Sequence, residues 1–579
     1  MIHLVLLSPS AADGEARPPA WSLGPAHRVA PSASEIHRVI DGIETDAETD
    51  VGADRSGDRL LFWHEDLGST ERVRRWIEEE LPTACGEIFH AGLRLGQGRR
   101  PAMMDFVHPT WMLQRDPVPD RSASSWRVSL RACLVPVSLW CAAGGLDEGF
   151  DDLEAAALEL GRRWWRLGAL LRHEPSWLDA PSLPAVQSVS AADELRFIRR
   201  SSGRFWSLWA VLRAGLVGDH GPSALLGAWR SLAGVGPAKI GPPLPEAPLP
   251  EAPMVPETEP GPRVGVLIPT LDRYPYLKVV LDQLQSQTIP PHRVVVVDQT
   301  DPERRRRDWH SAFPGLPLEV IEQDRRGQST ARNAGLRRLD VDRILFLDDD
   351  VEIEPDLIAR HLAVLEHFRA DVSCGVTEET GAGPLPEDFH RRRVSDVFPT
   401  CNCMIRSAVL QRSGFFDLAF DFGPRADADL GSRVYQSGAL MVLAPSISVL
   451  HHKAPAGGLR RHKARVVTYA QSRRSLWARH LPHATEFYLA RRYFTARQVK
   501  ESLLLRWAGT LRGKGSPSRQ AFKLLLGLLQ GPHTWWRMGR AERDARELAR
   551  TFPQIPFPEP RGSEVSAPES HRLDAEVAS

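Results

Sequence analysis

Hydrophobic residues after position 262 form short continuous runs that alternate with segments of helical spacing. The runs typical of buried strands are Val264–Ile268, Val294–Val297 and Arg343–Leu347, and the helical segments are Tyr276–Gln285, Thr330–Leu339 and Asp356–Phe368. This alternation predicts an α/β fold with a mainly parallel, Rossmann-like sheet covered by helices on both faces. Sheets of this kind bind ligands at the carboxyl ends of their strands. Asp298 and the run Asp348-Asp349-Asp350 stand at two such ends.

A similar pattern occurs earlier in the chain. Residues 131–175 align with residues 401–445 without a gap, at an offset of 270, and share 13 identities in 45 positions. Upstream, RLLFWHED at 59–66 matches RILFLDDD at 343–350 at an offset of 284. Downstream, the pairs Pro222-Ser223 and Pro517-Ser518 match at an offset of 295. Matches in the same order at three places favour duplication over chance, and predict two copies of one module.

The segment between the two copies is rich in proline and acidic residues. It reads GPPLPEAPLPEAPMVPETEPGP and is expected to form a semi-rigid extended linker. The predicted organisation is a first module at 1–240, the linker at 241–262, a second module at 263–485, a basic helical region at 486–551 and a disordered tail at 552–579.

The charge of the chain is balanced overall but uneven along its length. Equal numbers of basic and acidic residues, 73 of each, argue against a cationic protein that binds nucleic acid. Residues 453–550 contain 22 Lys and Arg against 5 Asp and Glu, a net charge of +17. Two interpretations remain open: helices that close the second module, or a surface for an anionic membrane or a lipid-diphosphate acceptor.

Three features bear on where the protein works. The first residues, MIHLVLLSPSA, lack the basic segment of a signal peptide. No apolar run approaches the ~18 residues of a membrane-spanning helix. Six cysteines are too few for a disulfide scaffold in a chain of this length. We therefore expect a cytoplasmic protein, with peripheral contact to the inner face of the cell membrane as a further expectation.

The three consecutive aspartates suggest a cation site. Three carboxylates at one edge of a sheet do not ionise together without a compensating positive charge. Oxygen ligands of this kind suit Mn²⁺ or Mg²⁺, which proteins often share with the phosphates of a substrate. Asp348, Asp349 and Asp350 are therefore candidate ligands.

Five segments between residues 262 and 452 together resemble a family 2 glycosyltransferase of the GT-A fold. They are PRVGVLIPTLDRYPYLKVVLDQLQSQTIPPHRVVVVDQTD, QDRRGQSTARNAGL, FLDDDVEIEPD, CNCMIRSAVLQRSGFFD with ADADLGSRVYQSG, and VLHHK. The resemblance covers about a third of the chain, and both copies if the duplication holds. It implies two GT-A-like modules. It also implies inverting transfer of a sugar from a nucleotide-diphosphate sugar to a saccharide or lipid-linked acceptor.

The resemblance also implies roles for individual residues. Pro269, Thr270 and Asp298 match positions that bind the nucleotide, Arg332 and Asn333 match positions that line the donor site, Asp348 and Asp350 match the DxD pair with Asp349 between them, and His451 or His452 matches a histidine that approaches the metal and diphosphate. The metal would be Mn²⁺ or Mg²⁺, held by Asp350 and Asp348 together with one of the histidines.

Asp427 occupies the family's position for the general base, which takes a proton from the acceptor hydroxyl group. The family commonly has Glu-Asp there, whereas this chain has Ala426-Asp427, and the change affects acceptor handling more than catalysis. Asp429 is the second candidate on the acceptor side. Both acids could instead stabilise the first turn of a helix.

The first copy lacks several of these residues. His64-Glu65-Asp66 stands opposite the three aspartates, Ala157 opposite Asp427, and Pro181 opposite His451. The first module is therefore predicted to be a degenerate copy that does not catalyse.

Two other functions remain as alternatives, because GT-A-like nucleotide-binding halves are not confined to sugar transfer. One is a nucleotidyltransferase, which would release pyrophosphate rather than a nucleoside diphosphate. The other is a non-catalytic scaffold that binds carbohydrate. Processive members of the family carry a Gln-x-x-Arg-Trp motif and membrane-spanning helices, and this sequence has neither in that form. The expected role is accordingly transfer of one or a few sugars in surface polysaccharide or glycan assembly of bacterial type, an expectation that rests on family analogy.

Overall fold

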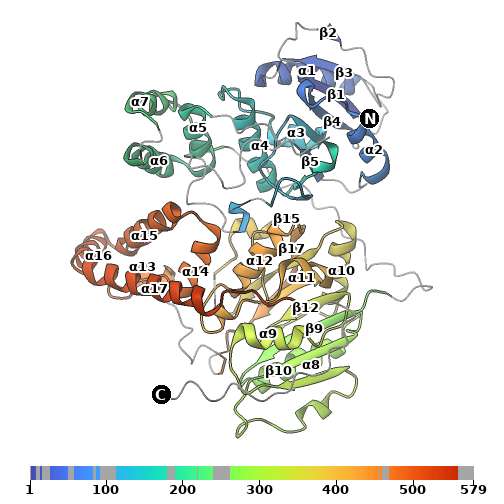
Figure 1. Ribbon diagram of the computed structural model, residues 1–579, viewed down its shortest axis with the longest axis vertical. Coiled ribbons are helices and arrows are strands. Elements are labelled where there is room, and N and C mark those ends of the chain that lie inside the picture. Colours follow the sequence, from blue (N-terminus) through green and yellow to red (C-terminus); the bar gives the residue numbers. More distant parts are fainter. Residues whose placement is uncertain are drawn as a thin grey trace.

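The computed structural model contains two units, each built on one large sheet (Figure 1). The first unit is formed by residues between 2 and 238 and the second by residues between 261 and 558. The structure describes residues 2–7, 14–15, 26–30, 32–49, 58–81, 87–91, 103, 112–115, 117–178, 189–217, 220–238, 241, 261–381, 383–454, 457–458 and 469–558. The predicted linker at 241–262 lies outside the described residues except at its two ends.

The sheet of the second unit is mixed, whereas the sequence predicted a mainly parallel one. Its strands are β9 (Val264–Thr270), β10 (Arg293–Asp298), β11 (Leu318–Glu322), β12 (Arg343–Leu347), β13 (Val351–Glu352), β14 (Val372–Glu379), β15 (Arg393–Val394), β16 (Asn402–Arg406) and β17 (Met441–His451). β9 to β12 are parallel, as predicted, but β16 pairs antiparallel with both β12 and β14. Hydrophobic runs locate strands without giving their direction, which explains the difference.

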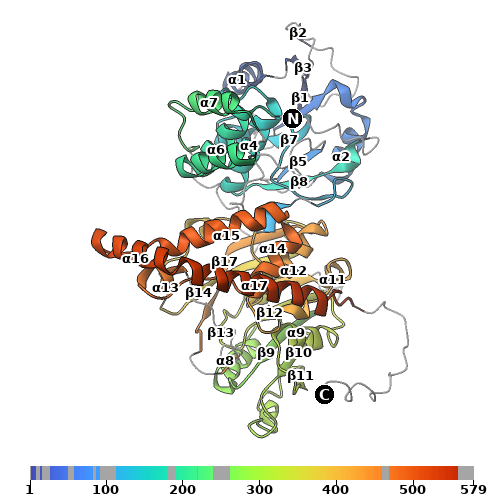
Figure 2. The ribbon, with the colours of Figure 1, turned by 60° about the vertical axis from the view of Figure 1, so that its left-hand side comes forward.

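The helices of the second unit cover this sheet and extend beyond it. They are α8 (Tyr274–Gln285), α9 (Gln328–Leu336), α10 (Leu357–His367), α11 (Ser407–Ser413), α12 (Ala426–Gln436), α13 (Tyr469–Arg474), α14 (Ala484–Tyr493), α15 (Ala496–Leu511), α16 (Pro517–Leu529) and α17 (Gly531–Thr551). α8, α9 and α10 confirm the three predicted helices, with ends shifted by a few residues. The basic region forms α14 to α17, which lie together at one side of the unit (Figures 1 and 2).

The first unit has the same strand order as the second. Its strands are β1 (Ile2–Leu7), β2 (Gly14–Glu15), β3 (Ala26–Val29), β4 (Arg59–His64), β5 (Glu87–Ala91), β6 (Ala123–Ser124), β7 (Ala132–Pro136) and β8 (Leu170–His173). Its helices are α1 (Ala33–Thr49), α2 (Glu71–Glu80), α3 (Val137–Ala143), α4 (Leu153–Leu167), α5 (Ala191–Ser202), α6 (Arg204–Val217) and α7 (Pro222–Ser231). The order β3-β1-β4-β7-β5-β8-β6 corresponds to β10-β9-β12-β16-β14-β17-β15, with matching directions in every pair.

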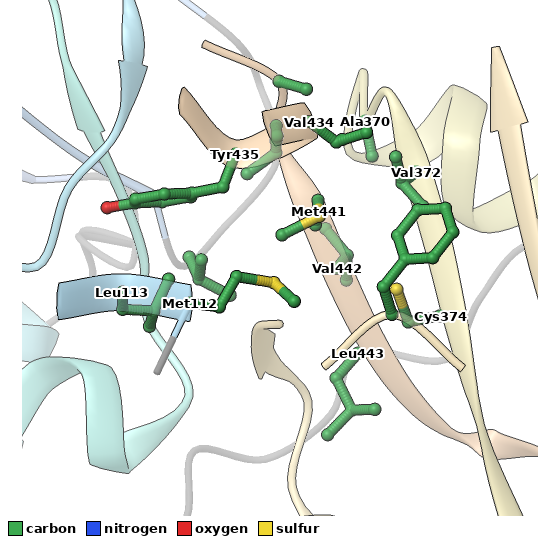
Figure 3. Packing of buried hydrophobic residues seen from close by; sticks show 14 of the residues in the cluster. Met112, Leu113, Ala370, Val372, Cys374, Val434, Tyr435, Met441, Val442 and Leu443 are labelled. Atoms are coloured by element: carbon green, nitrogen blue, oxygen red, sulfur yellow. The ribbon is translucent and has the colours of Figure 1, made fainter. Parts of the chain in front are cut away.

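The two units pack directly against each other through buried side chains. Met112 and Leu113, in the 3-10 helix η2 (Met112–Gln114) of the first unit, lie beside Tyr435 of α12 and Met441 of β17 (Figure 3). A Cβ atom on Gly431 of α12 would lie only 2.3 Å from the Cε atom of Met112. The close approach of α12 to Met112 therefore depends on the absence of a side chain at this position.

The described chain ends against the second unit. The backbone N–H of Phe415 donates a hydrogen bond to the carbonyl oxygen of Pro556 at 2.7 Å. Residues 552–558, at the start of the predicted tail, are thus in contact with α11, and the remainder of the tail lies outside the described residues. Among the described residues, no helix is both long and apolar enough to cross a membrane.

Candidate active site

A cleft opens at the carboxyl ends of β9 and β12, where the strand pattern predicted a site. Its volume is about 260 Å³. It is lined by Pro269, Thr270, Leu271, Arg273, Gln299, Gln328, Arg332, Asp348, Asp349, Asp350, Gly423, Pro424, His451 and Gly458. Seven of the residues that the sequence singled out therefore meet in one cleft, although they come from four separate segments of the chain.

The middle aspartate of the run points into the protein. The Thr270 hydroxyl donates to Asp349 Oδ2 at 2.8 Å, and Arg273 Nη1 donates to Asp349 Oδ1 at 2.9 Å. Burial raises the pKa of Asp349 to about 6, and the charge of Asp350 acts in the same direction, while Arg273 opposes both. Asp349 is thus a buried carboxylate that ties the end of β9 to the loop after β12.

The other two aspartates form a candidate cation site with one histidine. One potential ligand atom from each of Asp348, Asp350 and His451 lies within 4.8 Å of the other two. His451 Nε2 lies 3.1 Å from Asp350 Oδ1, and the backbone N–H of Ala454 donates to Asp350 Oδ2 at 2.8 Å. Burial disfavours the charged form of Asp350, but the hydrogen bond with His451 and the charge of Arg273 outweigh it and lower its pKa to about 2. Two carboxylates and an imidazole are a donor set that fits Mn²⁺.

Arginine side chains offset much of the negative charge in the cleft. Arg273 Nη1 lies 3.2 Å from Asp350 Oδ2 as well as contacting Asp349. Arg332 Nη2 donates to Asp348 Oδ1 at 2.9 Å, and its guanidinium group lies over the ring of Phe416. Each acid of the run therefore has a cationic partner, and two arginines are available to contact an anionic ligand.

Asp298 and Asn333 lie close to the cleft but do not line it. Asp298 is fully buried and accepts hydrogen bonds from the Tyr274 hydroxyl at 2.6 Å and the Thr300 backbone N–H at 2.9 Å. The Asn333 amide group makes two hydrogen bonds with the backbone of Phe416, one as donor and one as acceptor. In this structure Asn333 therefore holds α9 to the segment after α11 and makes no contact in the cleft.

The two candidate histidines have different surroundings. His451 belongs to the cation site, whereas His452 Nε2 lies 2.6 Å from Glu352 Oε1 and its ring lies beside Tyr276. Of the two histidines, only His451 therefore belongs to the group of described residues that could hold a metal ion.

Asp427 and Asp429, both in the first turn of α12, have opposite environments. Asp429 is fully buried and receives hydrogen bonds from Arg433, Arg492 and the Tyr493 hydroxyl. Asp427 is exposed, and the residues that the structure describes offer it no hydrogen bond or ion pair. It follows closely on Gly423 and Pro424, which line the cleft. Only Asp427 therefore has a carboxylate free to meet a substrate.

Sequence analysis missed several residues of the site. Arg273, Gln299 and Gln328 line the cleft, and none of them was singled out. Asp421 was missed as well: its carboxylate accepts hydrogen bonds from the backbone N–H and hydroxyl of Thr330 at the start of α9. Of these four residues, Arg273 could most easily have been predicted from the sequence, because it lies three residues beyond Thr270 and three neighbouring acids are expected to attract a cationic side chain.

Comparison with known proteins supports a glycosyltransferase domain in part of the chain. The model of the family described as glycosyl transferase family 2 matches residues 265–426. The uncharacterized glycosyltransferase YwdF of Bacillus subtilis is 24% identical over 168 residues, which are 27% of this chain and 62% of that protein. The glycosyltransferase AglE of Haloferax volcanii is 25% identical over 221 residues, which are 35% of this chain and 72% of that protein. The chain thus covers less than two thirds of YwdF.

Solved structures show weaker similarity. TarS of Staphylococcus aureus in complex with UDP-GlcNAc has 17% sequence identity and a TM-score of 0.31, covering 46% of this chain and 71% of that one. The mannosyltransferase PcManGT of Pyrobaculum calidifontis in complex with GDP-Man and Mn²⁺ has 19% identity and a TM-score of 0.30, covering 59% of this chain and 87% of that one.

Proposed function

We propose that this chain, whose residues 265–426 are a family 2 glycosyltransferase domain, transfers a sugar with inversion from a nucleotide-diphosphate sugar to a saccharide or lipid-linked acceptor. The observation that carries the proposal is the meeting of Asp348, Asp350 and His451 in the cleft at the ends of β9 and β12. We take bacterial-type surface polysaccharide or glycan assembly as the setting, by analogy with the family.

In this proposal the two sides of the cleft have different tasks. Asp348, Asp350 and His451 would hold Mn²⁺ or Mg²⁺, which when bound stabilises negative charge on a departing diphosphate. Arg332 and Arg273 contribute fixed positive charge to the same side. Asp427, three residues after the cleft-lining Pro424, accepts the proton of the acceptor hydroxyl group as a general base, a role that requires an unpaired carboxylate. Pro269 and Thr270 line the nucleotide side of the cleft, and Asp298 contributes to that side from a buried position next to it.

The first unit is, in our proposal, a duplicated copy that does not catalyse. Support comes from strand pairing: Phe62 pairs with Cys133 in the first sheet, and Phe346 pairs with Cys403 in the second. Phe62 and Phe346 are related by the offset of 284, and Cys133 and Cys403 by the offset of 270. The two sequence matches, with their different offsets, thus agree with the same strand pairing in the two sheets.

The positions that would make the first unit catalytic have changed. Asp66, opposite Asp350, lies near Arg131, and its neighbour His64 replaces the acid found at Asp348. Ala157, opposite Asp427, is fully buried in α4. Pro181, opposite His451, lies outside the described residues.

We also propose peripheral contact with an anionic membrane. α16 exposes the apolar side chains of Phe522, Leu524, Leu525, Leu528 and Leu529, and α6 exposes those of Phe205, Leu208, Leu212 and Leu216. α6 is joined to α15, since Arg213 Nε donates to Glu501 Oε2 at 2.7 Å. In both views α6 and α16 lie on the same side of the molecule (Figures 1 and 2). Basic residues of α15 to α17 would favour anionic lipids.

The test of the enzymatic proposal is a donor screen with purified full-length protein. A panel of nucleotide sugars is incubated with Mn²⁺ or Mg²⁺, and release of nucleoside diphosphate is measured. We expect release from one donor, loss of release with a chelator, and loss in Asp350→Asn because that change removes a charged ligand of the metal. Release of pyrophosphate would indicate nucleotidyl transfer instead. Full activity in the presence of chelator would contradict the metal assignment.

A further inference from the structure

A second cavity lies between the loop before α14 and one face of α17. Its volume is about 510 Å³. We call it the Arg479 pocket, and its lining residues are Arg479, Leu481, Pro482, His483, Ala484, His533, Trp536, Arg537, Arg540, Ala541 and Asp544. The residues from α17 recur every three or four positions, so one face of that helix forms a whole wall.

Arg479 is a buried cation whose hydrogen-bonding capacity is only partly used. Its side chain is 8% exposed, and Nη1 donates to the carbonyl oxygen of Leu476 at 2.8 Å. Its Nε and Nη2 atoms are buried without a hydrogen-bond partner among the described residues. Nη2 lies toward α16, 3.8 Å from where a Cβ atom on Gly527 would be, so burial of this guanidinium group carries a high desolvation cost.

The surroundings add positive charge rather than neutralising it. Lys523, which is 1% exposed, donates to the carbonyl oxygens of Ser472 and Ser475 rather than to a carboxylate. Burial lowers the pKa of Lys523, and the nearby charge of Arg479 lowers it further. Across the pocket, Arg537 and Arg540 are exposed and make no ion pair within the described part of the chain. With Asp544 as the single acid, the lining carries a net charge of +2 if the histidines are neutral.

The Arg479 pocket adjoins the cleft described above. His483 lines the pocket, and its Cε1 atom lies 2.8 Å from where a Cβ atom on Gly423 would be. Gly423 itself lines the cleft, and the Thr485 hydroxyl donates to the carbonyl oxygen of the neighbouring Pro424 at 2.8 Å. One short loop thus separates the two cavities, and the same loop leads directly into Asp427.

We propose that the Arg479 pocket binds a phosphate group of the acceptor while another part of the acceptor reaches Asp427. Planar guanidinium groups bind phosphate through paired hydrogen bonds, and the pocket is lined by three of them, from Arg479, Arg537 and Arg540. Trp536 is 56% exposed and stacks on His533, so the pocket also offers an apolar face beside its charges. The identification of the bound phosphate as part of the acceptor rests on the proposed function. Phosphate binding by the pocket does not depend on it.

The experiment measures phosphate binding by the full-length protein without donor or divalent metal. Inorganic phosphate is titrated by calorimetry into wild-type protein, Arg479→Met, the double variant Arg537→Met/Arg540→Met, and the control Arg550→Met. Arg550 also lies on α17 but is highly exposed and outside the pocket. We expect the dissociation constant for phosphate to rise about ten- to a hundredfold in the first two variants, because each loses charge-assisted hydrogen bonds to the phosphate. In the control variant the dissociation constant should stay unchanged.

The variants also separate the possible outcomes. If Arg479→Met does not fold, the double variant Arg537→Met/Arg540→Met tests the proposal instead, because both of its residues are exposed and contribute little to folding. Unchanged affinity in that variant, or no binding by wild-type protein, would overturn the proposal. Vesicles of phosphatidylcholine with phosphatidic acid form a second arm: weaker sedimentation of the variants would assign the phosphate to a lipid-linked acceptor, and an effect on inorganic phosphate alone would assign it to a soluble one. Phosphate binding by a protein that shows no turnover in the donor screen would contradict the enzymatic proposal but would still support the phosphate site.

Discussion

Two aspartates in one turn of α12 illustrate how burial separates chemical roles. Asp427 is exposed and free, whereas Asp429 is buried between Arg433 and Arg492. A general base must reach the acceptor and change its protonation state during the reaction. A fully buried carboxylate that pairs with Arg433 and Arg492 does neither without losing both ion pairs. The same residue type therefore serves chemistry at one position and stability at the other.

The matched substitutions Asp427→Asn and Asp429→Asn test this difference. Asp427→Asn should leave the thermal unfolding midpoint and donor affinity unchanged while lowering the transfer rate about 10²–10⁴-fold, the usual contribution of a general base. Asp429→Asn should lower the free energy of unfolding by about 3–5 kcal/mol, because Asp429 is fully buried and the change removes its ion pairs with Arg433 and Arg492. Unfolding is followed by denaturant titration and transfer by product formation. A wild-type rate in Asp427→Asn would reject the base assignment.

The sequence revealed residues at strand ends better than residues that act through distant contacts. Asp348 and Asp350 were predictable because they follow a hydrophobic run directly. Asn333 stands in a motif that resembles a donor site, yet its amide group binds the backbone of Phe416, a contact across 83 positions that no local pattern encodes. The role of Asp421 could not be predicted from the sequence for the same reason, since its hydrogen-bond partner Thr330 lies 91 positions away.

At the scale of elements, hydrophobic periodicity predicted the position of strands and helices but not their partners. β9, β10 and β12 and the helices α8, α9 and α10 were foreseen, and their parallel arrangement follows from the alternation. The antiparallel insertion of β16 was not, because direction depends on how the chain returns between elements. The apolar residues of α16 were visible in the sequence, but only the structure shows that they remain exposed.

Helix α16 provides the prediction at this scale. The double variant Leu525→Asp/Leu529→Asp should weaken binding to anionic vesicles at least tenfold, because it removes two exposed apolar side chains and adds negative charge. Sedimentation with vesicles is the measurement, and Val279→Asp on α8 is the control, an exposed apolar residue away from the basic helices. Binding of wild-type protein should fall with added salt, since salt screens surface charges over about 10 Å at 0.1 M. Equal binding by both variants would leave α16 without a membrane role.

At the scale of the molecule, the contact between the units is itself nearly symmetric. A Cβ atom on Gly168 would lie 2.4 Å from the carbonyl oxygen of Arg392, and one on Gly438 would lie 2.6 Å from that of Ser122. The offset of 270 relates Gly168 to Gly438 and Ser122 to Arg392. Both glycines have positive φ angles, 98° and 91°, which side chains rarely allow. At these two glycines, corresponding residues of the two units contact each other, as residues at the interface of a two-fold dimer do.

This arrangement gives the first unit a structural role that does not depend on catalysis by that unit. Met112 packs on Gly431 of α12, the helix whose first turn carries Asp427. Trp165 Nε1 donates to the carbonyl oxygen of Val394 at 3.1 Å, and Arg393 lies over the Trp165 ring. The first unit therefore supports α12, the helix that carries the proposed general base Asp427.

The final prediction compares the two units within the intact chain. Asp66→Asn and Asp350→Asn change residues related by the offset of 284, one in each unit. Asp350→Asn should abolish turnover because it alters the cation site, while Asp66→Asn should leave both turnover and the thermal unfolding midpoint unchanged, because Asp66 is 61% exposed. Both variants are assayed with the same donor, at the same metal concentration. A loss of turnover in Asp66→Asn without loss of stability would mean that the first unit takes part in catalysis. Residual turnover in Asp350→Asn that disappears in the double variant would lead to the same conclusion.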